Sequence, residues 1–298
     1  MRVAIIGGTG FVGRYLVDAL LDAGHRVTVL MRPGSEGKLL PCGCIRKVPG
    51  DLSDASALHA TLFDAKAVIY NVGLLREFPR RGITFEETQF QGVVDTVAAA
   101  RETGVKRMLL MSAIGVKNPG TKYQSTKRRA ELYALDSGLD VTVLRPSVIF
   151  GDPRGTMEFA TQLHQDMVKP PMPAVAFPGV QMSPVHIKDV AAAFVAALGD
   201  KATIGRTLEL AGPDVLSWRE IVTRIAAGSG KSKVILPMPL WIMRLGATLF
   251  DWLPFYPVTR DQLTMLAEGN TAPVDDLEAL LGRPARPFSE EALRYLVR

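Results

Sequence analysis

Short apolar runs alternate with stretches of helical spacing along the first two hundred residues. Runs that are wholly apolar and β-branched predict strands buried on both faces, and the amphipathic stretches between them predict covering helices. The expected strands are 3–6, 26–31, 45–48, 67–72, 107–111 and 141–144, and the expected helices are 15–23, one from about 55, 85–103 and 123–136. This alternation predicts an α/β fold with a doubly wound parallel sheet.

The alternation ends near Ser217, so a smaller and mostly helical C-terminal lid region is expected over 217–298. Within it, 234–258 is rich in Leu, Met, Trp, Phe and Pro. Apolar side chains recur there at three- and four-residue spacing, at Trp241, Leu245, Leu249 and Trp252. Two interpretations stay open, a buried stripe of the lid or an exposed surface for a membrane or a hydrophobic partner.

Composition excludes several classes of protein. The 298 residues are 47% apolar, which excludes wholesale disorder, and the charge of +5 comes without a dense Lys/Arg block, so no nucleic-acid partner is expected. We find neither a membrane-spanning run nor room for a signal peptide before Val3. Cys42 and Cys44 lie too close together to staple a fold, and no metal-ligand spacing occurs. These features predict a soluble protein of a reducing compartment, the cytoplasm.

A glycine-rich turn joins the first strand to the first helix. Strand, glycine turn, helix and second strand follow within about thirty residues, which is the context of a dinucleotide site. Gly7 allows the chain to turn, Gly10 allows a pyrophosphate to approach, and Gly13 allows the helix to pack closely. The expected cofactor contacts here are Gly7, Thr9, Gly10, Phe11, Val12 and Gly13. The domain that binds the cofactor is expected to span 1–216, with 151–185 contributing to a substrate pocket.

The end of the second strand predicts the choice of cofactor. NAD-binding proteins of this type usually place an acid there to bind the ribose 2′-hydroxyl, but this chain has Arg32 and, three residues later, Ser35. A guanidinium pairs with a 2′-phosphate, whereas a carboxylate would repel it. We therefore expect NADP(H) in preference to NAD(H). The alternative is that Arg32 is a solvated loop residue.

Further polar or small residues follow directly after other expected strands. They are Asp51 and Leu52, Asn71 and Gly73, Ser112, and Pro146 and Val148. Because the carboxyl ends of parallel strands share one edge of the sheet, these positions are expected to converge on one crevice. For Asp51 a second interpretation stays open, in which it caps the helix that follows.

Tyr123 and Lys127 form a Y-x-x-x-K pair at the start of an expected helix. Four-residue spacing places both side chains on one helical face. A phenol is a weak acid or base at neutral pH, and a neighbouring ammonium stabilises its phenolate. The pair is therefore a candidate catalytic pair, in which Lys127 can also hold a ribose.

These motifs together resemble the extended and atypical branches of the short-chain dehydrogenase/reductase superfamily. The chain is most similar to the branch of the NADPH-binding accessory subunit of respiratory complex I and its bacterial homologues, which are often described as nucleoside-diphosphate-sugar epimerase-like. The residues that carry the resemblance are the glycine turn with Thr9 and Phe11, Ser112–Gly115, the pair Tyr123 and Lys127, Arg145–Gly151, Pro184–Val190, Leu236–Trp241 and Pro287–Leu296.

The resemblance implies roles for several residues. It places Asp51 and Leu52 at the adenine, Asn71 and Gly73 beside a ribose, Pro146 and Val148 at the nicotinamide, and Tyr123 and Lys127 at the reacting centre. Three features depart from the superfamily pattern. Ser112 stands eleven residues before Tyr123 rather than about two dozen, Gln89 replaces a common Asn, and the connector 117–122 is short. Ser112 is for this reason an uncertain catalytic candidate, and His186 is interpreted as a structural histidine.

Two hypotheses of different classes follow. The first is an NADP(H)-dependent oxidoreductase that acts on an apolar carbonyl or quinone-like substrate. The second is a non-catalytic NADPH-binding accessory or assembly protein of a membrane-associated respiratory complex, docked through 234–258 and peripheral to the inner membrane.

Overall fold

The computed structural model describes residues 1–39, 42–74, 76–239 and 260–297. The chain forms two compact units, one of Met1–Arg145 with Ala191–Leu208 and one of Pro146–Val190 with Glu209–Arg298. The chain therefore enters the second unit at Pro146 and returns for one stretch to the first. This interleaving differs from the single boundary at 216/217 that the sequence suggests, because the pattern of strands and helices does not record where the chain crosses between cores.

A seven-stranded sheet forms the framework of the first unit. Its strands lie in the order β11-β6-β5-β4-β1-β2-β3, and the pairings from β3 through β6 are parallel. They are β1 (Arg2–Ile6), β2 (Arg26–Met31), β3 (Ile45–Pro49), β4 (Ala67–Tyr70), β5 (Arg107–Met111), β6 (Asp140–Pro146) and β11 (Thr207–Leu210). The order reverses between β1 and β4, which is the switch point where such sheets bind ligands. The predicted doubly wound fold is confirmed.

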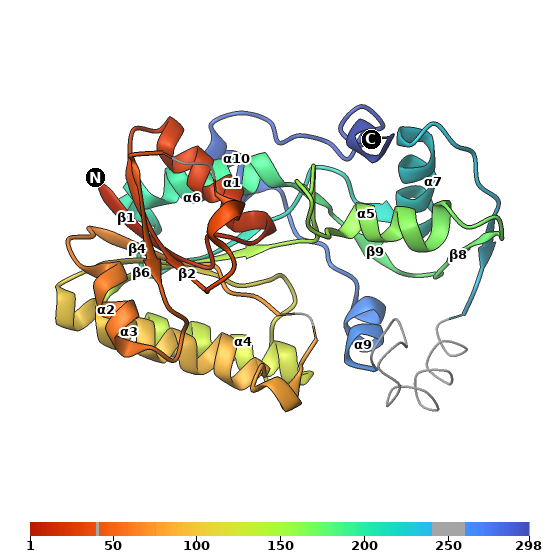
Figure 1. The fold of residues 1–298 in the computed structure, drawn as a ribbon. Coiled ribbons are helices and arrows are strands. Elements are labelled where there is room, and N and C mark those ends of the chain that lie inside the picture. Colours follow the sequence, from red (N-terminus) through yellow and green to blue (C-terminus); the bar gives the residue numbers. More distant parts are fainter. Residues whose placement is uncertain (40–41, 75, 240–259, 298) are drawn as a thin grey trace. The chain divides into compact units, whose positions relative to one another are not determined.

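Helices cover both faces of this sheet (Figure 1). Helices α1 (Phe11–Asp22) and α6 (Ile187–Gly199) lie on one face, and α2 (Ala55–Leu62), α3 (Gly92–Thr103) and α4 (Lys122–Leu135) lie on the other. The second face contributes Ala4, Ile6 and Val68 to a core with helix residues such as Leu58, Val97 and Ala134, all of them fully or almost fully buried. Burial on both faces explains why the strands are continuously apolar.

The long helix expected over 85–103 is interrupted at its start. A π-helical turn, η3 (Glu86–Gln91), precedes α3, and the amide of Gly92 donates to the carbonyl of Glu87. The carbonyl of Thr88 is thereby left to accept a hydrogen bond from the Tyr70 hydroxyl at 2.5 Å. A Cβ on Gly92 would lie 2.2 Å from that hydroxyl oxygen, so the close approach requires glycine. Helical periodicity alone gives no sign of this contact.

The second unit combines short strand pairs with helices around its own core. The pairs are β7 (Ile149–Phe150) with β10 (Val185–His186), β9 (Gln181–Met182) with β12 (Leu216–Ser217), and β8 (Ala174–Ala176) with β13 (Ile235–Pro237). The helices are α5 (Phe159–Leu163), α7 (Trp218–Gly228), α9 (Arg260–Glu268) and α10 (Asp275–Leu281), with a π-helical turn η4 (His164–Val168) and a terminal turn η6 (Arg294–Val297). Phe150, Trp218 and Phe288 pack in its core.

The C-terminal part is mostly helical, as expected, but the aromatic stripe cannot be assigned. Trp241, Leu245, Leu249 and Trp252 all lie outside the described residues. Of the described part of 234–258, Val234 and Leu236 are exposed and Ile235 is buried. In the ranges that the structure describes, every helix is too short or too polar to cross a membrane. The choice between a buried stripe and a docking surface stays a prediction.

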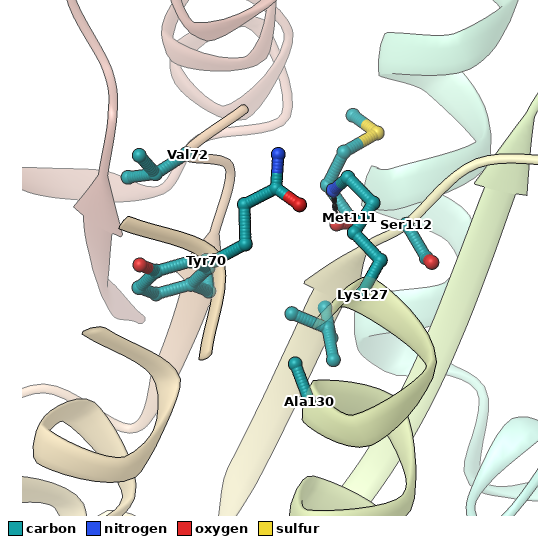
Figure 2. A pocket seen from close by; sticks show the side chains of 8 residues that line it. Tyr70, Val72, Met111, Ser112, Lys127 and Ala130 are labelled. Atoms are coloured by element: carbon teal, nitrogen blue, oxygen red, sulfur yellow. Dashed lines mark hydrogen bonds between the residues drawn. The ribbon is translucent and has the colours of Figure 1, made fainter. Parts of the chain in front are cut away.

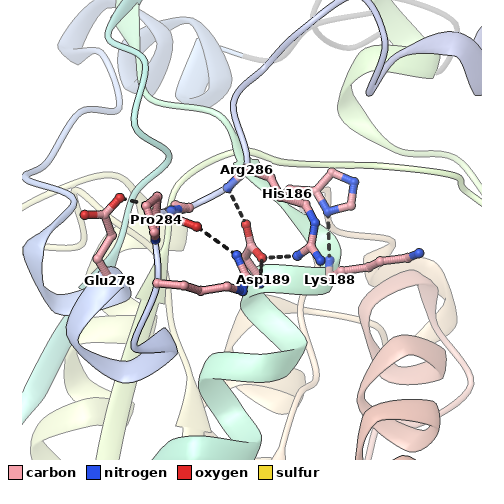
Figure 3. A network of polar contacts seen from close by, with 8 residues as sticks. His186, Lys188, Asp189, Glu278, Pro284 and Arg286 are labelled. Carbon is pink, nitrogen blue, oxygen red and sulfur yellow. Dashed lines mark hydrogen bonds and ion pairs between the residues drawn. The ribbon is translucent and has the colours of Figure 1, made fainter.

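A buried carboxylate holds the C-terminal segment of the second unit (Figure 3). The Asp189 side chain is fully buried and accepts hydrogen bonds from the side chains of Arg283 and Arg286 and from the Arg286 amide, the last at 2.7 Å. Both arginines keep about two fifths of their side chains exposed. The network therefore fixes the chain just before Phe288 enters the core.

We expect Asp189→Asn to destabilise the protein by about 2 kcal/mol, because a neutral amide cannot replace charge-assisted bonds to two arginines. Chemical denaturation of the purified protein would measure this. The matched control is Glu290→Gln, since Glu290 is exposed. Equal stability of the two variants would show that the network contributes nothing.

Candidate cofactor site

The glycine turn is packed too closely for larger residues at three positions. Gly7 has φ of +91°, and a Cβ there would lie 2.4 Å from the carbonyl oxygen of Asn71. A Cβ on Gly13 would lie 2.1 Å from the carbonyl oxygen of Gly7, and one on Gly8 would lie 2.8 Å from Val29. The need for glycine at position 8 could not be predicted from the sequence, because the residue that it contacts, Val29, belongs to another strand, β2. These contacts hold the start of α1 against the end of β1.

Gly10 differs from its neighbours because space is open above it. The nearest atom to a Cβ built there is the carbonyl oxygen of Gly7 at 3.8 Å, which is ordinary contact. Gly10 is also the N-cap of α1, and no side chain caps that end of the helix. The first amides of α1 are thus available to an anion, and the helix dipole favours one. The turn fits a dinucleotide pyrophosphate.

The remaining residues of the turn support this geometry. Phe11 and Tyr15 make an edge-to-face contact at 6.0 Å between ring centroids, and Thr9, Phe11 and Val12 are half-buried. Their individual cofactor contacts stay predictions. Asn71 donates from Nδ2 to the carbonyl oxygen of Gly7 at 3.3 Å, which ties the end of β4 to the turn, and Gly73 is exposed beyond it.

Residues after β2 and β3 lie at the same edge of the sheet, because these strands are parallel and in register with β1. Arg32 is exposed directly after β2, whereas the nearby Ser35 is buried. The Asp51 carboxylate accepts from the amide and hydroxyl of Ser53, at 2.9 and 2.6 Å. The interpretation of Asp51 as a helix cap is wrong, since Asp54 is the N-cap of α2. Leu52 packs against the core of the first unit.

Tyr123 and Lys127 lie on one face of α4, as predicted. The Lys127 ammonium lies 5.8 Å from the centre of the Tyr123 ring and donates to the carbonyl oxygen of Met111, the last residue of β5, at 3.2 Å. Burial raises the pKa of Tyr123, so the phenol is protonated at neutral pH. Burial also lowers the pKa of Lys127 to about 8. In this structure desolvation therefore outweighs the stabilisation of the phenolate that an ammonium was expected to provide.

A cavity of about 10 Å³ lies beside the Lys127 stem (Figure 2). Tyr70, Val72, Met111, Ser112 and Ala130 line it with Lys127. Gln89, from the π-helical turn η3, also lines it. Such a space holds at most about one water molecule, so it is too small for a substrate. Ser112 is 4% exposed and lines this cavity. Its role as a group that contacts substrate stays a prediction.

Glu131 is a buried acid that the sequence reasoning missed. Its side chain is fully buried and receives both Nε and Nη2 of Arg145, at 2.7 and 2.5 Å, and Nη1 of Arg128 at 2.9 Å. Burial alone would raise its pKa, but the hydrogen bonds and charges of Arg145 and Arg128 lower it overall. The sequence could have indicated Glu131 through its spacing, because a residue four positions after Lys127 lies on the same face of α4.

Three residues singled out from the sequence belong to the second unit. Pro146 ends β6, and the Val148 amide donates to the Asn270 side chain at 3.0 Å. The predicted nicotinamide contacts of Pro146 and Val148 stay predictions. His186 accepts from the Lys188 amide and packs edge-to-face on Phe150, and burial lowers the pKa of His186 to about 4. A neutral, hydrogen-bonded histidine agrees with its interpretation as structural.

The sheet order, the glycine turn and the open helix terminus define a pyridine-nucleotide-binding protein of the doubly wound class. A family model described as NAD(P)H-binding matches residues 7–201, and the chain belongs to this family. The resemblance to the extended short-chain dehydrogenase/reductase superfamily and to its complex I branch is confirmed.

Similar proteins carry several names. The chain is 32% identical over 229 residues to NADH dehydrogenase (ubiquinone) 1 alpha subcomplex subunit 9 of Arabidopsis thaliana, covering 73% of this chain and 55% of the relative. The mouse protein of that name is 26% identical, covering 91% and 73%. Ceramide reductase of Caulobacter vibrioides is 28% identical, covering 84% and 78%. The chain thus spans little more than half of the plant relative.

Solved structures share the fold. UDP-glucose 4-epimerase of Thermus thermophilus, solved with NAD, has a TM-score of 0.74 at 21% identity and covers 100% of this chain and 98% of its own. UDP-glucuronic acid 4-epimerase of Bacillus cereus has a TM-score of 0.72 at 18% identity, covering 99% of each chain. At these identities the likeness concerns the fold alone.

Replacing glycine by alanine at two positions of the turn should affect two different properties, cofactor binding at Gly10 and stability at Gly13. Gly10→Ala should leave stability unchanged but weaken NADPH binding by about tenfold, because its methyl group points into the space for the phosphates. Gly13→Ala should destabilise the protein itself by about 1–3 kcal/mol through overpacking. Thermal unfolding and NADPH fluorescence titration measure both effects.

Gly199→Ala serves as the control, because nothing lies within 4 Å of a Cβ at Gly199. If Gly10→Ala bound NADPH as tightly as this control, the turn would not be the phosphate site.

Proposed function

We propose that the protein is an NADP(H)-dependent oxidoreductase that reduces an apolar carbonyl or quinone-like substrate. The observation that carries this proposal is the placement of Tyr123 and Lys127 on one face of α4, with Lys127 fixed on the last carbonyl of β5. That carbonyl stands at the same sheet edge as the glycine turn, since β1, β4 and β5 are parallel and in register.

In the proposed reaction the cofactor supplies the hydride, and the chain supplies a proton and positions the reactants. The Tyr123 phenol holds its proton at neutral pH and can donate it, while burial, which raises its pKa, makes it a weaker acid. Lys127 would bind the nicotinamide ribose through its ammonium and stabilise the phenolate once the proton has left.

The preference for NADP(H) rests on the end of β2. Arg32 is exposed there, and residues 31–35 include no acid to accept the ribose 2′-hydroxyl. A guanidinium pairs with the doubly charged 2′-phosphate by charge-assisted hydrogen bonds. Ser35 is a second candidate donor, although it is buried in this structure.

The proposed substrate class rests on polarity and on relatives. The segment 151–185 carries only five Asp, Glu, Lys or Arg residues, which favours an apolar substrate over a sugar nucleotide. One relative is named ceramide reductase and another is named divinyl chlorophyllide a 8-vinyl-reductase, and both names indicate reductases.

A second candidate function is that of a non-catalytic NADPH-binding accessory or assembly protein. Burial of Ser112 favours it, because a hydroxyl on a buried side chain is not accessible to a substrate. Relatives named as subunit 9 of NADH dehydrogenase agree with this candidate. The partner would then be a membrane-associated respiratory complex contacted through 234–258, and the protein would lie in the cytoplasm at the inner membrane.

Arg32→Glu tests the cofactor preference. We expect NADPH affinity to fall at least about tenfold, with NADH affinity little changed, because the carboxylate repels the 2′-phosphate and accepts the 2′-hydroxyl. Parallel titrations with both cofactors give the ratio. Arg26→Glu, at the other end of β2, is the control for net charge. An unchanged ratio in Arg32→Glu would remove Arg32 from the site.

Single-turnover oxidation of bound NADPH tests the reaction. Wild-type protein loaded with NADPH and mixed with quinones and carbonyls should lose nicotinamide absorbance. Tyr123→Phe should slow this by about 10²-fold or more while NADPH still binds, because the proton donor is missing.

Tyr133→Phe, on the same helix, is the matched control and should behave as the wild type. If the panel is reduced equally fast by Tyr123→Phe, Tyr123 is not the proton donor. If NADPH stays reduced in every variant, the accessory function is favoured.

A further inference from the structure

One face of α4 carries a third ionisable side chain next to the proposed catalytic pair. Tyr123, Lys127 and Glu131 are spaced four residues apart, so they follow each other along that face. Lys127 is 5% exposed and Glu131 is fully buried. The Glu131 carboxylate favours the charged form of Lys127 and so opposes the larger effect of burial on the pKa of Lys127.

We propose that Glu131 is a positioning residue for this site, whose buried carboxylate keeps the Lys127 ammonium protonated in its position on the carbonyl oxygen of Met111. The inference rests on the proposed function, in which Lys127 anchors the cofactor ribose. Glu131 itself contacts neither substrate nor cofactor. It acts through Lys127, one helical turn away.

The orientation of Glu131 is fixed by elements outside α4. Arg145 from β6 grips both carboxylate oxygens, and Arg128 binds one of them. A carboxylate held by a bidentate guanidinium has little freedom to turn. Ala130, its neighbour in sequence, lines the same small cavity as Lys127.

The charges around Lys127 explain why Glu131 matters. The ionisable groups around Lys127 and Glu131 are the phenols of Tyr70 and Tyr123 beside the lysine, and the guanidinium groups of Arg128 and Arg145 on the carboxylate. Burial raises the pKa of both phenols, so they stay neutral across the useful pH range. Glu131 is therefore the one anion in this group, and its loss would leave Lys127 beside two uncompensated cations.

The proposal predicts shifts of opposite sign in two variants. We expect the titration midpoint of Lys127, near 8 in the wild type, to fall by about one unit in Glu131→Gln. Arg128→Gln should raise the midpoint instead, because one competing cation is gone. Arg128 is one third exposed, so its removal should leave the fold intact even if Glu131→Gln fails to fold.

The midpoint can be read without any cofactor. The pH titration of the lysine ¹³Cε NMR signals, with that of Lys127 assigned from Lys127→Met, measures it directly in the free protein. The control is Glu86→Gln, which removes an exposed carboxylate that also pairs with an arginine. Shifts of opposite sign in the two test variants, with none in the control, establish the proposal. A midpoint that Arg128→Gln leaves unchanged, or that a folded Glu131→Gln leaves unchanged, overturns it.

A second titration separates this inference from the proposed function. NADPH affinity, measured from pH 6.5 to 9.5 by cofactor fluorescence, should decline with the same midpoint and shift with it in each variant. If the NMR midpoints shift as expected but NADPH affinity ignores them, Glu131 controls Lys127 while Lys127 does not anchor the ribose. If neither responds, the positioning role itself is wrong.

Discussion

Close backbone packing at the glycine turn is the constraint on which the cofactor site depends. The start of α1 lies so near the end of β1 that a Cβ on Gly13 would come within 2.1 Å of the Gly7 carbonyl oxygen. The Asn71 side chain ties β4 to that same carbonyl. Because these contacts fix the N-terminus of α1 over the switch point of the sheet, its uncapped amides face the place where a pyrophosphate binds. Every other candidate residue of the first unit is placed relative to this turn by the parallel register of the strands.

A second group of contacts supports the reacting end of the site. Lys127 is fixed on the carbonyl of Met111, and the carboxylate of Glu131 is held by Arg145 and Arg128. Buried charges cost free energy unless they are paired, so this cluster is held in one arrangement by its own electrostatics. Tyr123 lies on the same helical face, with its ring against that of Phe85. A proton donor on a rigid support is what a reductase requires, and the same support would hold a cofactor that never reacts.

The names of the similar proteins divide between reductases and subunits of NADH dehydrogenase. The chain's own residues bear on that division. The paired Tyr123 and Lys127 favour chemistry, whereas the buried hydroxyl of Ser112 favours a structural cofactor. The Asp189 network is independent of both, since it fastens the C-terminal segment within the second unit.

The sequence by itself determined the sheet, the glycine turn and the Tyr123–Lys127 pair, because strand burial, tight turns and helical spacing are local patterns in the chain. It also placed the strand-end residues at one edge, since parallel strands share direction. Only the tertiary structure decided that Val29 leaves no space for a Cβ at Gly8 and that the Tyr70 hydroxyl leaves none at Gly92. The ion pair between Glu131 and Arg145 was also visible only in the structure. Each of these contacts joins residues from different elements, and no periodicity records which elements become neighbours. The interleaving of the two units was hidden for the same reason, because the crossing at Pro146 interrupts no pattern of strands and helices.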